Sequence, residues 1–215
     1  MKTVHWLIIF AFVSCCIGCS SKDAQGRTEI NAKDEDEASV TEAQLLQQGK
    51  KYFEEGLYSV AQEKFQSLVN NFPLGPYAEF SSLKIADAEY AMAKYTDAIS
   101  SYQSFSQSYP NSAARPYAIL QVAICFQLAN QGIGRDNATL EGAEKAYQKL
   151  FTEYPDSLFS DTGKKGYDDL LALRAAHQEF ILNFYKKRGF TEAYEARKQE
   201  FDSKWKQHLK NSDEN

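Results

Sequence analysis

Residues 45–77 read LLQQGKKYFEEGLYSVAQEKFQSLVNNFPLGPY, and this stretch decides the fold. Within a unit of about 34 residues that begins at Glu42, small, aromatic and helix-breaking residues stand at regular positions. These are Gly49, Tyr52, Gly56, Ala61, Phe65 and Pro73. Because two helices approach closely only where side chains are small, the pattern predicts an antiparallel pair that crosses at Gly49 and Ala61. Pro73 cannot continue a helix and therefore ends the second one.

The unit has the pattern of a tetratricopeptide (TPR) repeat, and it recurs along the chain. The residues Ala61, Phe65 and Pro73 are followed 37 residues later by Ala98, Tyr102 and Pro110, and 45 residues after those by Ala143, Tyr147 and Pro155. The first helices of successive units stay 37 residues apart. The additional eight residues of the third unit therefore belong to a loop between its two helices, at 130–139. The sequence predicts an all-α, TPR-like helical-hairpin superhelix of about four repeats.

The predicted domain covers 42–215 and consists of four repeats followed by a short polar tail. The repeats are expected at about 42–75, 76–112, 113–157 and 158–209. In the fourth, the helical period of apolar residues predicts a long helix over 160–188, ended by Gly189. A final amphipathic helix over 191–209, with mostly charged last turns, is expected to cap the array.

The N-terminal residues 1–18 combine a positive charge, an apolar run too short to span a bilayer, and small residues, as secretory signals do. The cysteine that follows, Cys19, resembles the acylated cysteine of bacterial lipoproteins. We therefore expect a lipid on Cys19, with Cys15 as the alternative acceptor and a plain cleaved signal as the alternative interpretation. Ser20 favours the outer membrane by resemblance to sorting rules. Residues 19–41 are acidic and lack apolar periodicity, which predicts a disordered tether.

The net charge is −5 and the pI is near 5.3, which argues against nucleic acid as a partner. Charge is nevertheless uneven, because residues 186–210 hold eight Lys and Arg against four acids. Neither metal nor cofactor is expected: His177 stands alone on a helix, where we interpret it as a polar-face residue. Cys125 lies in an apolar run and is interpreted as a buried thiol. No domain remains to hold an active site, so a fused enzyme is disfavoured.

Binding is the remaining kind of function, and first helices of TPR pairs line the concave face of the array. The candidate peptide groove consists of Phe53, Phe80, Tyr90, Tyr117 and Gln127. Exposed aromatic side chains suit an extended peptide or a partner helix, because they offer apolar area with little rotamer entropy. The alternative is that these aromatics belong to the core.

Several motifs together resemble the BamD family of outer-membrane β-barrel assembly lipoproteins. They are FPLGPY at 72–77, Arg135-Asp136 in the inserted loop, YPDSLF at 154–159, and FYKKRG at 184–189 followed by Ala193 and Arg197. The resemblance covers about 43–201. It implies a periplasmic-face, lipid-anchored scaffold of the outer membrane that binds a barrel-forming subunit through its POTRA domains and helps receive unfolded outer-membrane proteins.

By the same resemblance, Arg197 faces the last POTRA domain, and the basic end with Arg188 and Lys187 suits an acidic partner. A solvated helix charge is the alternative interpretation of Arg197. The family pattern continues with another tyrosine-proline turn and a fifth repeat, which the resemblance does not find after Phe201. The alternative function is another periplasmic TPR scaffold of the Tol-associated type that coordinates envelope constriction.

Overall fold

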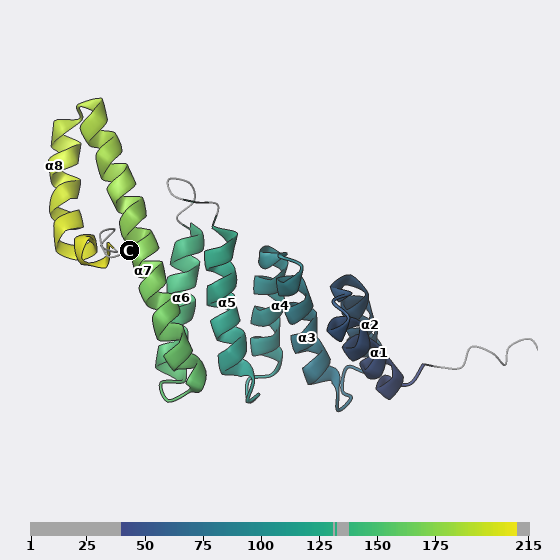
Figure 1. Cartoon of the computed structure of the whole chain (residues 1–215). Helices are drawn as coiled ribbons and strands as arrows, with labels where there is room; N and C mark the ends of the chain where they lie inside the picture. The colour runs from purple at the N-terminus through teal and green to yellow at the C-terminus, as the bar shows by residue number, and fades with distance from the viewer. Residues whose placement is uncertain (1–39, 131, 133–137, 210–215) are drawn as a thin grey trace, which may run out of the picture. The chain divides into compact units, whose positions relative to one another are not determined.

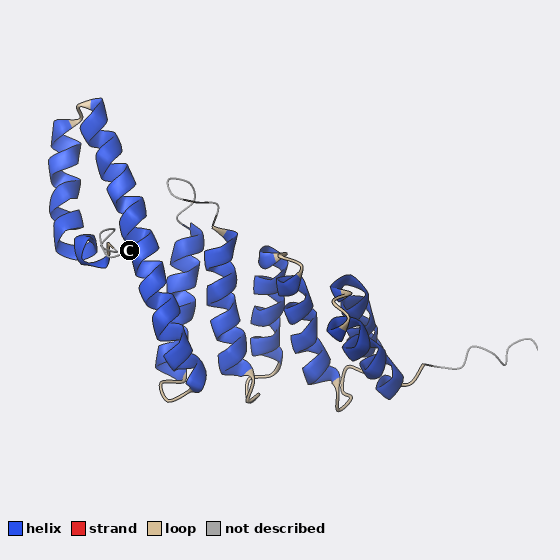
Figure 2. Cartoon of the chain, in the orientation of Figure 1, coloured by secondary structure: helices blue, strands red, loops and turns tan. Residues whose placement is uncertain are grey.

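The computed structural model describes residues 40–130, 132 and 138–209, and this part of the chain is all-α without a strand (Figures 1 and 2). Its helices are α1 (Glu42–Glu54), α2 (Tyr58–Asn71), α3 (Ala78–Ala91), α4 (Tyr95–Ser108), α5 (Arg115–Ala129), α6 (Ala138–Glu153), α7 (Leu158–Arg188) and α8 (Thr191–Glu200). A π-helical turn, η1 (Phe201–Trp205), and a 3₁₀ turn, η2 (Lys206–His208), follow. Each helix packs against the next in the chain, which confirms the predicted TPR-like stack of helical hairpins.

Local sequence sets where the helices begin and end. Thr41 caps α1: its hydroxyl accepts a hydrogen bond from the Gln44 backbone N–H, while the Gln44 side chain accepts one from the Thr41 N–H. The hydroxyl of Ser157 caps α7. Gly189 ends α7 in the left-handed conformation with φ of 75°, as the sequence predicted.

The predicted helix crossings are confirmed. A Cβ atom on Gly49 would lie 2.6 Å from Cε1 of the Phe65 ring, so only glycine allows this approach of α1 to α2. The alanines that recur in the second helices, Ala61, Ala98 and Ala143, are completely buried. The repeat therefore follows from the need for small side chains at each crossing.

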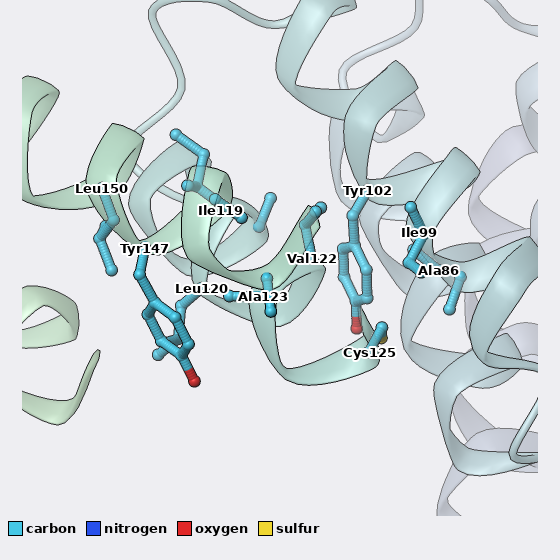
Figure 3. Close-up of a cluster of buried hydrophobic side chains, with 14 of the residues drawn as sticks. Ala86, Ile99, Tyr102, Ile119, Leu120, Val122, Ala123, Cys125, Tyr147 and Leu150 are labelled. Carbon is cyan, nitrogen blue, oxygen red and sulfur yellow. The ribbon is translucent and has the colours of Figure 1, made fainter. Parts of the chain in front are cut away.

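The largest core lies where α5 packs between α4 and α6. Ile119, Val122 and other side chains of α5 lie between the buried rings of Tyr102 and Tyr147 (Figure 3). Cys125 is completely buried in this core, as predicted, and burial raises the pKa of its thiol to about 12. It is therefore a packing residue that stays protonated.

The two helices of the third hairpin are farther apart in the sequence than those of the first two, in keeping with the predicted insertion. The connection from α5 to α6 covers residues 130–137, whereas residues 55–57 and 92–94 suffice in the first two hairpins. The Asn130 amide donates a hydrogen bond to the Thr139 hydroxyl at 3.0 Å across the base of this connection.

The fourth hairpin departs from the other three. Its first helix, α7, is a continuous helix of 31 residues, whereas α1 to α6 have 13 to 16. The first part of α7 packs on α5 and α6; its later part packs on α8, η1 and η2 around a small separate core of Ala175, Leu182, Phe201 and Trp205.

Two expectations for this hairpin were wrong. The segment 191–209 is not one regular α-helix, because the chain changes to π and then 3₁₀ geometry after Glu200, with Phe201 and Trp205 buried against α7. His177 is not a polar-face residue, since only 5% of it is exposed. It shares a stripe of α7 with Leu170 and Arg174, at helical spacing, and that stripe is buried.

Candidate binding surfaces

The first candidate surface joins α1, α3 and α5. The Lys84 ammonium lies 4.9 Å from the centroid of the Phe53 ring and 5.7 Å from that of Phe80, so a cation bridges two of the predicted groove residues. Lys84 also pairs with the carboxylate of Asp87 at 2.8 Å. Asp87 in turn contacts Tyr117, and we call Phe53, Phe80, Lys84, Asp87 and Tyr117 the aromatic row.

Asp87 fixes the inner end of the aromatic row. Its Oδ1 accepts hydrogen bonds from the hydroxyls of Tyr102 at 2.7 Å and Tyr117 at 2.9 Å, and the carboxyl group is buried. Burial, and then the nearby Asp87 charge, raise the pKa of both tyrosines. The Tyr117 hydroxyl is therefore engaged within the protein. Phe80, which is 37% exposed, offers the most accessible ring of the row.

The other two predicted groove residues do not join the row. Tyr90 lies against Tyr95, with ring centroids 6.1 Å apart. The Gln127 amide accepts a hydrogen bond from the Tyr147 hydroxyl at 2.6 Å and donates one to the Gly166 carbonyl at 3.2 Å, which ties α5 to α6 and α7. Their role in a groove stays a prediction.

The second candidate surface is the end of the hairpin formed by α7 and α8. Three aromatic side chains are exposed there: Phe180 by 53%, Phe184 by 46% and Phe190 by 54%. We call these three the aromatic tip. A cluster of large exposed apolar side chains commonly marks an interaction site, because leaving it in water is unfavourable.

The predicted partner residues lie beside the aromatic tip. The Arg188 guanidinium is 5.6 Å from the centroid of the Phe184 ring, and that of Arg197 is 5.0 Å from the Tyr185 ring. Lys187 is exposed in the last turn of α7. Cations stacked on aromatic rings keep their charge accessible to an acidic partner. The rings were missed as surface residues because their helical spacing is equally that of a core stripe; the adjacent Lys-Lys-Arg run was the available signal.

A buried arginine holds this hairpin in place. Arg174 of α7 forms an ion pair with Glu144 of α6, and its guanidinium lies 4.8 Å from the centroid of the Trp205 ring in η1. Burial lowers the pKa of Arg174, and the charge of Glu141 opposes that effect. Arg174 thus connects the third hairpin to the turn that follows α8.

Other predicted features lie elsewhere. Cys19, the alternative Cys15, the tether at 19–41, and the loop pair Arg135 and Asp136 are outside the described residues. Within the described ranges, no group of three His, Cys, Asp or Glu side chains could hold a metal ion. None of the helices there combines the length and the apolar composition needed to cross a bilayer.

Comparison with known proteins agrees with the resemblance seen in the motifs. Residues 38–212 match the YfiO family, outer membrane lipoprotein. The outer membrane protein assembly factor BamD of Haemophilus influenzae is 27% identical over 87% of this chain and 71% of its own length. BamD of Pasteurella multocida is 24% identical with the same coverage, and BamD of Xylella fastidiosa is 25% identical over 62% of this chain and 49% of its own. This chain therefore belongs to the YfiO family of outer membrane lipoproteins, the family of BamD.

Proposed function

We propose that this protein is a lipid-anchored scaffold at the periplasmic face of the outer membrane that takes part in outer-membrane protein assembly. In this proposal the aromatic tip and its cations bind the POTRA-bearing barrel subunit. The aromatic row helps receive unfolded outer-membrane proteins. The role is binding rather than catalysis, in keeping with relatives named as assembly factors.

The composition of the tip is the observation that carries the proposal. Between 184 and 198 the chain has five cations against two carboxylates, next to rings that are about half exposed. Aromatic side chains and arginine are the residues most often responsible for affinity at protein interfaces. The cations favour a partner surface with carboxylates, and the rings supply apolar area once water is excluded.

The aromatic row supports the second part of the proposal. Phe53, Phe80 and Tyr117 are held in fixed positions by Lys84 and Asp87, so they lose little conformational entropy on binding. An unfolded outer-membrane protein offers alternating apolar side chains, which suit a row of rings.

Affinity for the POTRA region of the barrel subunit tests the tip. We expect Arg197→Glu and Phe184→Ser each to weaken binding by about tenfold or more, the effect of about 1.4 kcal/mol. Matched controls, both far from the tip on α7, are Lys165→Glu for charge and Leu158→Ser for an exposed apolar side chain, and both should bind as the wild type does. Equal binding by all four variants would contradict the proposal, as would recovery of Tol components without a POTRA protein.

Capture of urea-unfolded outer-membrane protein tests the aromatic row. Phe80→Ala should reduce capture while leaving the helical circular dichroism signal nearly unchanged, and Tyr90→Ala, outside the row, should reduce capture less. Loss of that signal would show that the rings are packing residues. The comparison also separates Phe80, which is in the row, from Tyr90, which is not.

The proposed anchor is a lipid on Cys19. Mass spectrometry of the mature N-terminus should find acyl chains on this cysteine, and Cys19→Ser should release the protein from outer-membrane fractions. An unmodified N-terminus at another position, or acylation of Cys15, would contradict this assignment.

A further inference from the structure

A third surface lies in the groove between α4 and α6, with α5 as its floor. The groove has a volume of about 800 Å³. Ile119, Val122 and Phe126 form the floor, at a spacing that places them on one side of α5. Tyr117 of the aromatic row lies on the other side of that helix. The groove is thus separate from the aromatic row and from the aromatic tip.

The internal repeat allows this groove to be compared with its counterpart between α2 and α4. At the 37-residue spacing of first helices, Phe126 corresponds to Glu89. The buried carboxylate of Glu89 accepts a hydrogen bond from the amide of Gln62 at 2.8 Å, so in the counterpart a polar contact joins α2 to α3. In the α4–α6 groove the same position holds a ring and gives the floor an apolar surface.

The second helices of the two grooves, α6 and α4, also differ by the loss of an acidic residue. At their 45-residue spacing, Gly142 corresponds to Asp97, and a Cβ on Gly142 would lie 2.7 Å from Cε1 of the Phe126 ring. An acidic residue in the counterpart is therefore replaced by the one residue that leaves room for the ring. The two changes together remove carboxylates and add apolar surface.

The α6 wall of the groove carries two lysines at positions where its counterpart has uncharged residues. Lys145 and Lys149 correspond to Ser100 and Ser104, and they stand one helical turn apart. Lys145 forms no ion pair within the described part of the chain, and Lys149 has only a distant one, 4.0 Å from Glu153. Both lysines are exposed, so their charge is available at the rim.

The remaining polar residues at the groove leave this charge in place. The Arg115 guanidinium pairs with Glu153 at 3.3 Å and donates to the Tyr154 hydroxyl at 3.1 Å. Glu141 adds one carboxylate to the α6 wall, so the lining keeps three cations, Arg115, Lys145 and Lys149, against one acid. On the α4 wall, Gln103 and Gln107 present uncharged amides, which can bond to the backbone of an extended chain.

We propose that the α4–α6 groove binds an acidic segment of a partner polypeptide, with an apolar side chain on the α5 floor and carboxylates on Lys145 and Lys149. Charge complementarity selects this occupant, because the lysines face the groove from one wall and the opposite wall is uncharged. The volume lies within the range of clefts that bind small molecules, about 300–1,000 Å³, and so leaves room for an apolar side chain.

Fluorescence anisotropy with a short labelled peptide tests this site on the mature chain. The probe carries glutamates on both sides of leucines; one matched peptide replaces the glutamates by glutamine and a second replaces the leucines by serine. We expect binding of the first peptide and at least about tenfold weaker binding of the other two, since each lacks one of the two complementary features.

Variants locate the binding on the protein. The double substitution Lys145→Glu with Lys149→Glu should reduce affinity by about tenfold or more, and Gln107→Trp, which obstructs the groove without changing charge, should do the same. The control is Lys164→Glu with Lys165→Glu on α7, an equal change of net charge outside the groove. Unchanged thermal unfolding verifies that each variant is folded, and Lys145→Gln with Lys149→Gln replaces the charge reversal if it is not.

Three results would overturn the proposal: equal affinity for the glutamate and glutamine peptides, equal loss in the α7 control, or full binding by Gln107→Trp. None of them bears on POTRA binding, because the aromatic tip is unchanged in these variants.

Discussion

The first three hairpins and the fourth are built from the same repeat but stabilised differently. In α2 to α6 each helix packs against the helix before it and the helix after it, and one core of buried side chains runs from Ala86 in α3 to Leu170 in α7. The later part of α7 instead packs on α8, η1 and η2 around four buried apolar residues. The stacked hairpins thus form the rigid part, while the fourth presents exposed rings at its end. The contrast predicts a higher free energy of opening for α3 to α6 than for the later part of α7 and α8.

The largest expected effect comes from the continuous core. Leu150→Ala removes a completely buried side chain between α6 and its neighbours, and we expect a loss of about 2–5 kcal/mol in the free energy of unfolding. Urea denaturation followed by circular dichroism measures it. A loss below about 1 kcal/mol would mean that this core relaxes to fill the cavity, and the contrast between the regions would fail.

The second largest loss in the free energy of unfolding is expected at a helix crossing. Ala61→Leu inserts volume where α1 meets α2, beside the Phe65 ring, and should lower the free energy of unfolding by about 1–3 kcal/mol. The half-buried Val60→Leu change on the same helix serves as control, since only part of that side chain is in contact. If both variants unfold at the same urea concentration, the crossing has more room than the burial indicates.

Trp205→Ala should lower the free energy of global unfolding less than the two changes above, although it removes a large side chain. Trp205 packs within the small C-terminal core and under Arg174, so its removal should open α8 and η1 locally. Amide hydrogen exchange should show lost protection in α8 with little change in α1 to α4. Loss of protection throughout the chain would show that the fourth hairpin unfolds together with the others.

The smallest effect is a pH dependence within the first two hairpins. Burial raises the pKa of the Glu89 carboxyl above its ordinary value of 4.5, with Asp97 contributing and Ser101, Lys94 and Gln62 opposing. Because the folded state holds this proton more tightly, the stability due to Glu89 is present below pH 4.5 and is lost as the pH rises through the raised pKa. Glu89→Gln should therefore gain stability relative to the wild type between pH 5 and pH 7. A difference that is constant with pH would contradict the sign.

The repeat and its register could be read from the sequence because they depend on side-chain size at fixed spacing. Gly49, Ala61 and the insertion after α5 are of this kind, since none of the three needs a distant partner to be recognised. Polar residues that become buried could not be read in this way. Asp87, Arg174 and His177 look like solvent-exposed helix residues until the helices that cover them are placed. The hydroxyl of Tyr117 and the amide of Gln127 are likewise taken up by partners on other helices.

The exposed rings at the end of α7 show the same limit of sequence-based prediction, here for apolar side chains that stay exposed instead of polar side chains that are buried. Phe180 and Phe184 have the spacing of a buried stripe, and only the packing of α8 decides that they face solvent. Periodicity tells which residues share a side of a helix, whereas the tertiary structure tells whether that side is covered.

The length of α7 has a mechanical consequence. A continuous helix of 31 residues is about 46 Å long, so it connects the aromatic tip to the core as one rigid element. This helix packs closely on α6 at Gly163 and Gly166, where any larger side chain would meet Leu150 or the Tyr147 hydroxyl. A displacement of α7 at Phe184 would therefore tilt the helix against α5 and α6. The close packing at Gly163 and Gly166 determines how much of that displacement reaches the stacked hairpins.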